Sequence, residues 1–171
     1  PVSLPVAPDA VRDRYLPVTM NGMTVGTPLF VLTTVEDYGA GYRMISAFET
    51  DNRRVMVDLG YVPLSALGVS PDAESQMVVG NLHWPDEIDE FTPEPDRANN
   101  IWFARDVDRM AAKLGAEPVL LILRGATPAT PEILPLPVSR AGIPNDHLSY
   151  AITWFSLAVI WFVMTAFLLW R

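Results

Sequence analysis

The sequence contains no cysteine among its 171 residues and only two histidines, His83 and His147. The lack of cysteine excludes disulfides, thiol nucleophiles and most structural zinc sites. Two histidines cannot complete the usual zinc ligand sets without carboxylates, so we expect no metal site. The chain also has no G-x-S-x-G nucleophile elbow, no glycine-rich phosphate loop and no paired-glycine dinucleotide fingerprint. These absences favour a protein that is not an enzyme.

Basic residues are also scarce, with 12 Lys and Arg against 20 Asp and Glu. All 20 acidic residues and 11 of the 12 basic ones lie in residues 1–149, which gives that part a net charge of −9. Nucleic-acid phosphates and anionic lipid headgroups both attract basic surfaces. We therefore expect no nucleic-acid partner and no basic patch beside the membrane.

Charge is absent altogether from Leu148 to Trp170. An α-helix over residues 150–170 would be roughly 30 Å long, which matches the hydrocarbon core of a bilayer. Aromatic residues lie near both ends of this run, as they do at membrane interfaces: Tyr150 and Trp154 at the start, and Trp170 at the end. The run predicts a transmembrane helix, and the lipid bilayer is accordingly an expected partner.

The chain therefore divides into three expected parts: an extracytoplasmic β-rich domain (1–125), a proline-rich connection (126–146) and the transmembrane helix (147–171). The basic Arg171 directly after the apolar run predicts that the C-terminus faces the cytoplasm or matrix. Because Pro1 is not an initiator methionine, we also expect an upstream segment, with a further transmembrane helix, that this sequence does not include.

Sixteen prolines and many β-branched residues before the apolar run predict short strands separated by turns. Strands are expected at residues 16–20, 27–35, 41–48, 54–62, 76–84 and 119–123. The dipeptide Asn21-Gly22 is typical of two-residue hairpins and predicts a turn after the first strand. Gly80 predicts a β-bulge within the fifth strand.

One helix is expected before the last strand, beginning after a suitable N-cap, Asp106, and ending at Gly115. Its apolar residues follow the i, i+3, i+4, i+7 spacing: Val107, Met110, Ala111 and Leu114. The predicted fold class is mainly β, a small antiparallel barrel or sandwich with one short α-helix, followed by a C-terminal transmembrane helix.

His147 is the strongest candidate for a binding residue, because it lies at the start of the predicted membrane helix. A neutral imidazole at the membrane interface is suited to be an axial ligand of haem iron. Tyr150 and Trp154 are candidate contacts for a haem macrocycle or for a protein partner. The alternative is an interfacial histidine whose ring only extends toward the headgroups.

Two other polar features are interpreted as structural. His83 falls in a predicted strand, where a histidine more often completes a sheet than binds a ligand. The acidic run at residues 86–90 could bind calcium or a partner. It lacks the glycine and the terminal glutamate of a calcium loop, so a solvated loop is the favoured interpretation.

Three stretches match a known pattern: VMVDLGYVP (55–63), NIWFARD (100–106) with the following Met110-Ala111, and PNDHLSYAITWF (144–155). Together they resemble the Surfeit locus protein 1 family of cytochrome c oxidase assembly factors. The chain departs from the family pattern at four positions. Asp58 and Leu59 replace asparagine and arginine, Tyr61 replaces tryptophan, and Asp146 replaces a second asparagine.

The resemblance implies two transmembrane helices flanking a β-rich domain on the periplasmic or intermembrane-space side. The membrane would be the bacterial cytoplasmic or mitochondrial inner membrane. It also implies a role in assembling the haem-containing catalytic subunit, with that subunit and haem A biosynthesis enzymes as partners. Haem A is the implied cofactor, with the histidine matching His147 as its ligand. Two hypotheses follow: a chaperone that assists haem A insertion, or a scaffold or accessory subunit of the respiratory oxidase that binds no haem.

Overall fold

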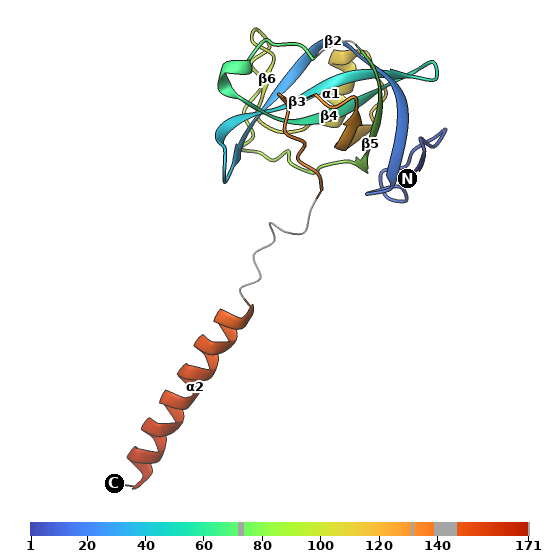
Figure 1. Cartoon of the computed structure of the whole chain (residues 1–171). Helices are drawn as coiled ribbons and strands as arrows, with labels where there is room; N and C mark the ends of the chain where they lie inside the picture. The colour runs from blue at the N-terminus through green and yellow to red at the C-terminus, as the bar shows by residue number, and fades with distance from the viewer. Residues whose placement is uncertain (72–73, 131, 139–146, 171) are drawn as a thin grey trace. The chain divides into compact units, whose positions relative to one another are not determined.

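The computed structural model describes residues 1–71, 74–130, 132–138 and 147–170, with the backbone alone for His147. The chain forms two compact units, Pro1–Val138 and Ser139–Arg171 (Figure 1). The first unit contains all the strands, and the second contains the long helix α2 (His147–Trp170). We describe each unit by itself.

Five strands close into a barrel in the first unit. They are β2 (Pro17–Val35), β3 (Gly39–Thr50), β4 (Arg53–Pro63), β7 (Leu120–Thr127) and β5 (Ser75–His83), hydrogen-bonded in that order, and β5 pairs back onto β2. The β4–β7 pair is parallel and the other four pairs are antiparallel. The fold class predicted from the sequence is confirmed, and the barrel is the form that it takes.

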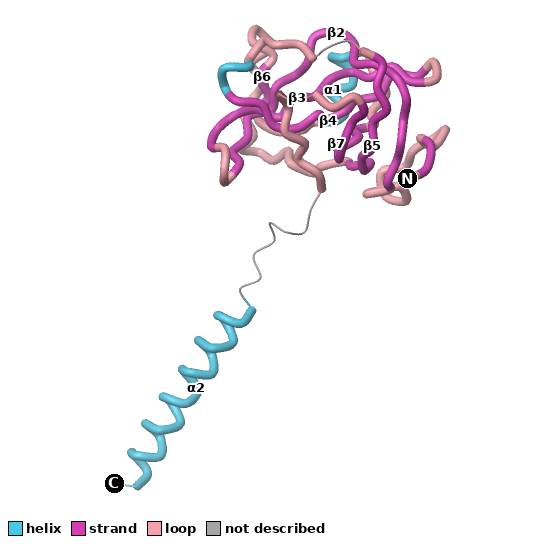
Figure 2. Tube along the Cα trace, in the orientation of Figure 1, coloured by secondary structure: helices cyan, strands magenta, loops and turns pink. Residues whose placement is uncertain are grey.

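Short elements complete the unit. Two-residue strands β1 (Val2–Ser3) and β6 (Ile101–Trp102) pair in parallel with β2. A 3₁₀ turn, η1 (Leu64–Ala66), follows β4, and helix α1 (Val107–Leu114) precedes β7. The strands wrap around the barrel axis while α1 lies against the barrel wall (Figure 2).

The hairpin predicted at Asn21-Gly22 is wrong, because β2 runs through both residues without a turn. The first part of β2 pairs with β5, and the rest pairs with β3. A Cβ atom on Gly22 would lie 1.9 Å from the carbonyl oxygen of Glu49, so glycine allows the two backbones to approach closely. Tertiary packing in the barrel therefore overrides the local turn signal.

The turn between β3 and β4 has the geometry that a two-residue hairpin requires. Asp51 and Asn52 both have positive φ, 42° and 62°, as expected for a type I′ turn. A β-bulge occurs at the position predicted from Gly80, but on the partner strand β7. Val79 pairs with Gly125 and the next residue, Gly80, pairs with Leu123, so the register shifts by one residue. The extra residue is thus on β7.

Two apolar clusters stabilise the unit. One fills the barrel and includes Phe30, Phe48 and Leu121, all buried. The other lies between the barrel wall and α1 and includes Met110 and Trp102. The predicted helix is confirmed with its caps: the Asp106 side chain accepts a hydrogen bond from the Arg109 amide, and Gly115 is left-handed.

The chain after β7 packs onto the barrel, and the compact unit runs to Val138. Ile133 is 9% exposed and belongs to the barrel cluster. Leu134 and Tyr61 exchange two backbone hydrogen bonds, of 2.7 and 3.0 Å. Residues 139–146, the rest of the predicted connection, lie outside the described residues.

Candidate functional site

Helix α2 carries the site predicted from the sequence. The most apolar 18 residues within Leu148–Trp170 have a mean hydropathy of 2.2, and this helix is long and apolar enough to cross a membrane. Tyr150 and Trp154 are 66% and 69% exposed, so neither side chain is buried within the helix. Positions 147, 150 and 154 share one face of an α-helix. The His147 side chain lies outside the described residues.

Two hydroxyl side chains within α2 make local hydrogen bonds. The Thr153 hydroxyl donates to the carbonyl oxygen of Ser149 at 2.9 Å, and the Ser156 hydroxyl donates to that of Ile152 at 2.7 Å. Such bonds let Ser and Thr face hydrocarbon without an unsatisfied donor. The helix therefore presents an uncharged, mainly apolar and aromatic surface to its surroundings.

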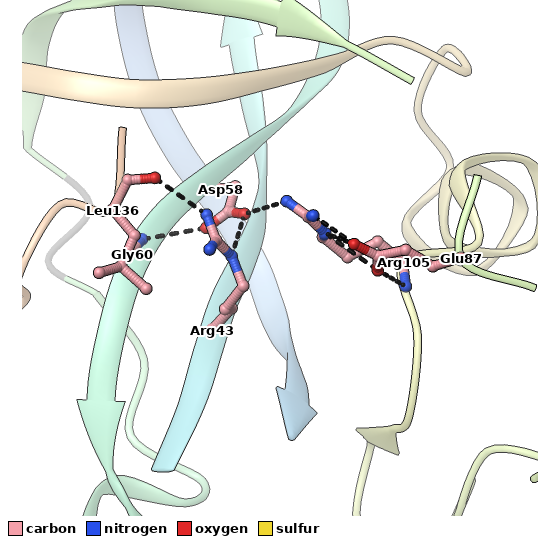
Figure 3. A network of polar contacts seen from close by, with 6 residues as sticks. All are labelled: Arg43, Asp58, Gly60, Glu87, Arg105 and Leu136. Atoms are coloured by element: carbon pink, nitrogen blue, oxygen red, sulfur yellow. Dashed lines mark hydrogen bonds and ion pairs between the residues drawn. The ribbon is translucent and has the colours of Figure 1, made fainter. Parts of the chain in front are cut away.

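A buried carboxylate, Asp58 of β4, is the centre of a polar network on the barrel wall (Figure 3). Arg43 of β3 donates from Nε to Asp58 Oδ2 at 2.7 Å. Arg105 Nη1 lies 3.5 Å from the same oxygen, and the Gly60 amide donates to Oδ1 at 3.2 Å. A buried carboxylate is costly unless it is paired and hydrogen-bonded, and Asp58 is both.

Arg105 extends the network to the long connection between β5 and β6. Its backbone amide donates to Glu87 Oε2 at 3.0 Å, and its Nε donates to Oε1 at 3.1 Å. Burial acts to raise the pKa of Glu87, but the hydrogen bonds and charge of Arg105 outweigh it, so the pKa of Glu87 is lowered. Arg105 therefore attaches this connection to the barrel wall.

The network also reaches the segment after β7. Arg43 Nη2 donates to the carbonyl oxygen of Leu136 at 3.1 Å. Two arginines, Arg43 and Arg105, face two carboxylates, Asp58 and Glu87, so their formal charges cancel. The cluster therefore carries no net formal charge, and its contacts join five segments of the chain: β3, β4, the connection between β5 and β6, the segment after β6 and the segment after β7.

Position 60, within the stretch VMVDLGYVP (55–63), requires glycine for a structural reason. Its φ is +122°, and a Cβ atom there would lie 2.1 Å from the carbonyl oxygen of Leu134. The neighbouring Tyr61 makes the backbone pair with Leu134, and its hydroxyl donates to the carbonyl oxygen of Tyr38 at 3.0 Å. This stretch therefore forms the docking surface for the segment that leads toward α2.

His83 lies close to the same network. Its ring stacks on Tyr15 with centroids 5.0 Å apart. Its Nδ1 atom is buried and makes no hydrogen bond to a described residue. Desolvation, followed by the nearby cations Arg105 and Arg14, lowers the pKa of His83 and favours the neutral ring. Among the described residues, no three His, Asp or Glu side chains gather into a possible metal site.

Sequence reasoning missed Arg43, Arg105 and Glu87, although two signals were available. Arg43 and Ile45 are two residues apart and therefore lie on the same face of β3, where Ile45 is fully buried. Asp58 interrupts the apolar part of β4, residues 55–63. A charged residue at a core-facing position must find a partner of opposite charge. The identity of that partner depends on the fold, so it could not be read from spacing.

The fold and the apolar helix define a small five-stranded barrel unit followed by a helix able to span a membrane. The model of the SURF1 family matches residues 1–159, and the chain belongs to this family. Membership confirms the resemblance of the three stretches described above. No solved structure matches the chain.

Curated relatives come from animals and bacteria. The chain is 34% identical over 148 residues to a SURF1-like protein of Drosophila melanogaster, covering 82% of this chain and 47% of the relative. It is 26% identical over 119 residues to Surfeit locus protein 1 of Rattus norvegicus, covering 63% and 38%. It is 29% identical over 140 residues to a SURF1-like protein of Rickettsia prowazekii, covering 77% and 56%. The chain thus spans about half the length of these relatives.

Proposed function

We propose that this chain is a membrane-anchored assembly factor for haem–copper cytochrome c oxidase. It would act without catalysing a reaction, by assisting haem A insertion into the catalytic subunit or by stabilising that subunit during biogenesis. Membership of the SURF1 family is the single observation that carries the proposal. The apolar helix supports it, because the substrate of such a factor is itself a membrane protein.

The helix supplies the residues for a haem A step. His147 is the proposed axial ligand, and Tyr150 and Trp154 are the proposed contacts of the macrocycle. The two rings are exposed, uncharged and on the helix face that position 147 shares, so they fit a flat apolar group. Bound haem A would bring an iron that accepts an imidazole ligand. The chain's own residues would hold the group and exclude water from it.

Visible absorption tests this step. The full chain is purified in detergent from a host that makes haem A, beside His147→Ala and a control, His83→Ala. We expect a haem A band in the wild type and in His83→Ala, and its loss in His147→Ala. A band that persists in His147→Ala would place haem elsewhere. The lack of a band in all three proteins would exclude stable haem binding.

A scaffold that binds no haem is the second candidate function, and the surface of α2 favours it specifically. Trp154 and Trp161 are seven residues apart, which places them on one face, and they are 69% and 70% exposed. Aromatic side chains of this kind often provide most of the binding energy at an interface. On this hypothesis the helix clasps a membrane helix of the oxidase catalytic subunit.

Co-purification separates the two candidates. The catalytic subunit is recovered with the full chain carrying His147→Ala, or Trp154→Ala with Trp161→Ala, or Phe155→Ala with Phe162→Ala as the matched control. A scaffold loses its partner only with the tryptophan pair. Retention of the partner by all three variants would exclude α2 as the docking surface. Failure of the wild-type chain itself to recover the subunit would count against the assembly role.

A further inference from the structure

The connection between β5 and β6, residues 84–100, displays apolar side chains that the barrel does not cover. Phe91 is 82% exposed, the highest exposed fraction of any phenylalanine in the described part of the chain, and Ile88 is 49% exposed. A phenyl ring in water is unfavourable by its apolar area. An exposed aromatic ring on a fixed segment can anchor a partner, because aromatic side chains often provide much of the binding energy at an interface. We call residues 86–91 the Phe91 loop.

The Phe91 loop is anchored to the barrel unit on both sides of the ring. Before it, Glu87 is held by the Arg105 amide and side chain, and Arg105 contacts the buried Asp58 (Figure 3). After it, Arg109 of α1 donates from Nη2 to Glu94 Oε2 at 2.7 Å. Preorganised residues lose less conformational freedom on binding, so a fixed loop binds more tightly than a free one.

Local hydrogen bonds also fix the backbone at the tip. Asp89 Oδ1 accepts from the Phe91 amide at 2.9 Å and from the Thr92 hydroxyl at 2.8 Å. The Asp89 amide donates to the Thr92 hydroxyl oxygen at 2.9 Å. These bonds define the position from which the ring projects. The chemistry of a binding partner follows instead from the charges around the ring.

The negative charge of the connection indicates which kind of partner would bind the Phe91 loop. Residues 84–100 carry six carboxylates and one basic residue, Arg97. Glu87 and Glu94 are paired with arginines, whereas Asp86 and Glu90 of the same loop are exposed and form no ion pair with a described residue. Anionic lipid headgroups would repel this surface, and burial in a bilayer would desolvate its carboxylates. A protein surface with an apolar socket rimmed by Lys or Arg is complementary to it.

We propose that the Phe91 loop is a docking surface for a basic, apolar-centred patch on an extracytoplasmic protein segment, with the phenyl ring as its anchor. The inference rests on the proposed function for two expectations: that the segment is extracytoplasmic and that it belongs to the oxidase catalytic subunit. The interface itself is defined by the exposed ring, by the anchored residues Glu87 and Glu94 on either side of it, and by the carboxylates of the loop.

Site-specific photo-crosslinking in native membranes tests the proposal with the full chain. A photoreactive phenylalanine analogue replaces Phe91, and in the control it replaces Tyr38, another exposed aromatic residue on a turn. A further variant combines the analogue at position 91 with Asp86→Lys and Glu90→Lys. Thermal unfolding of each variant shows whether the barrel remains folded.

We expect crosslinks from position 91, but not from position 38, to a protein peptide that contains Lys or Arg beside apolar residues. The yield should fall about tenfold in the charge-reversed variant, because like charges across an interface are repulsive. Crosslinks to lipid, equal yields from both positions, an acidic peptide or no crosslink at all would overturn the inference. If the basic peptide comes from a protein other than the oxidase, the interface stands and the proposed function fails.

Discussion

Arg43 and Asp58, on the adjacent strands β3 and β4, form an ion pair of 2.7 Å in which the carboxylate is fully buried. The same guanidinium donates to the carbonyl oxygen of Leu136, beyond the barrel strands. One arginine thus joins the barrel wall to the segment that leads toward α2. Arg105 continues the network from Asp58 to Glu87, so the ion pair also supports the first part of the Phe91 loop.

Replacing Asp58 with asparagine tests this network. The variant leaves Arg43 and Arg105 in a buried site without the carboxylate, and removing one partner of such a pair costs about 3–5 kcal/mol. We expect a loss of this size in the free energy of unfolding, measured by denaturant titration of the barrel unit in the full chain. The control Asp37→Asn, on an exposed turn, should change stability by less than about 0.5 kcal/mol. Equal stability of Asp58→Asn and wild type would show that the network contributes little.

Gly60→Ala should detach the segment after β7 from the barrel. The added methyl group would collide with the carbonyl of Leu134, which removes the two backbone bonds between Leu134 and Tyr61. We expect a loss of about 2–4 kcal/mol and faster hydrogen exchange at the Leu134 amide. Gly39→Ala is the matched control, because Gly39 also has a positive φ, +76°, but no atom lies within 4 Å of the added carbon. Unchanged exchange at Leu134 in Gly60→Ala would contradict this account.

The sequence predicts the elements of this fold better than their connections. The turn at Asp51-Asn52 and the capped helix after Asp106 are local, so residue type and spacing identify them. The Asn21-Gly22 prediction is wrong because β2 exchanges partners along its length, from β5 to β3. That exchange closes the barrel and depends on contacts far apart in the chain, which no local pattern contains.

The candidate site divides in the same way. The apolar run and the position of His147 follow from the sequence, because a membrane span needs only length and composition. The partners of Asp58 do not, because Arg43 and Arg105 reach it only when β3, β4 and the segment after β6 are assembled. The role of His147 as a ligand remains a prediction that the described residues do not test.

His83 should make the barrel unit less stable in mild acid. Its pKa is lowered in the folded state by desolvation and by Arg105, so the unfolded state binds a proton first as the pH falls. Stability should therefore decrease as the pH falls from 7 through about 6.5, the ordinary value of histidine. In His83→Gln we expect a flatter dependence of the melting temperature on pH between 7 and 5.5. The pKa of Glu87 is also lowered, so its contribution to stability is lost only at pH values below its ordinary pKa of 4.5. Both proteins should therefore still lose stability in that lower pH range. The same slope in both proteins would contradict the role of His83.

The absence of cysteine makes the orientation of the chain directly measurable. Single cysteines at Asp37, on the barrel, and at Arg171, after α2, are labelled in intact cells or mitoplasts with a thiol reagent that does not cross the membrane. We expect labelling at position 37 alone, because the barrel should lie on the periplasmic or intermembrane-space side. Labelling at position 171 alone would reverse the proposed orientation.

The most direct test of the assembly role is deletion of the gene in the native host, followed by measurement of oxidase activity and haem A content in isolated membranes. We predict that both fall, that the gene for the wild-type protein restores them, and that the same gene without the codons for residues 148–170 does not. Full oxidase activity with unchanged haem A in the deletion strain would contradict the account.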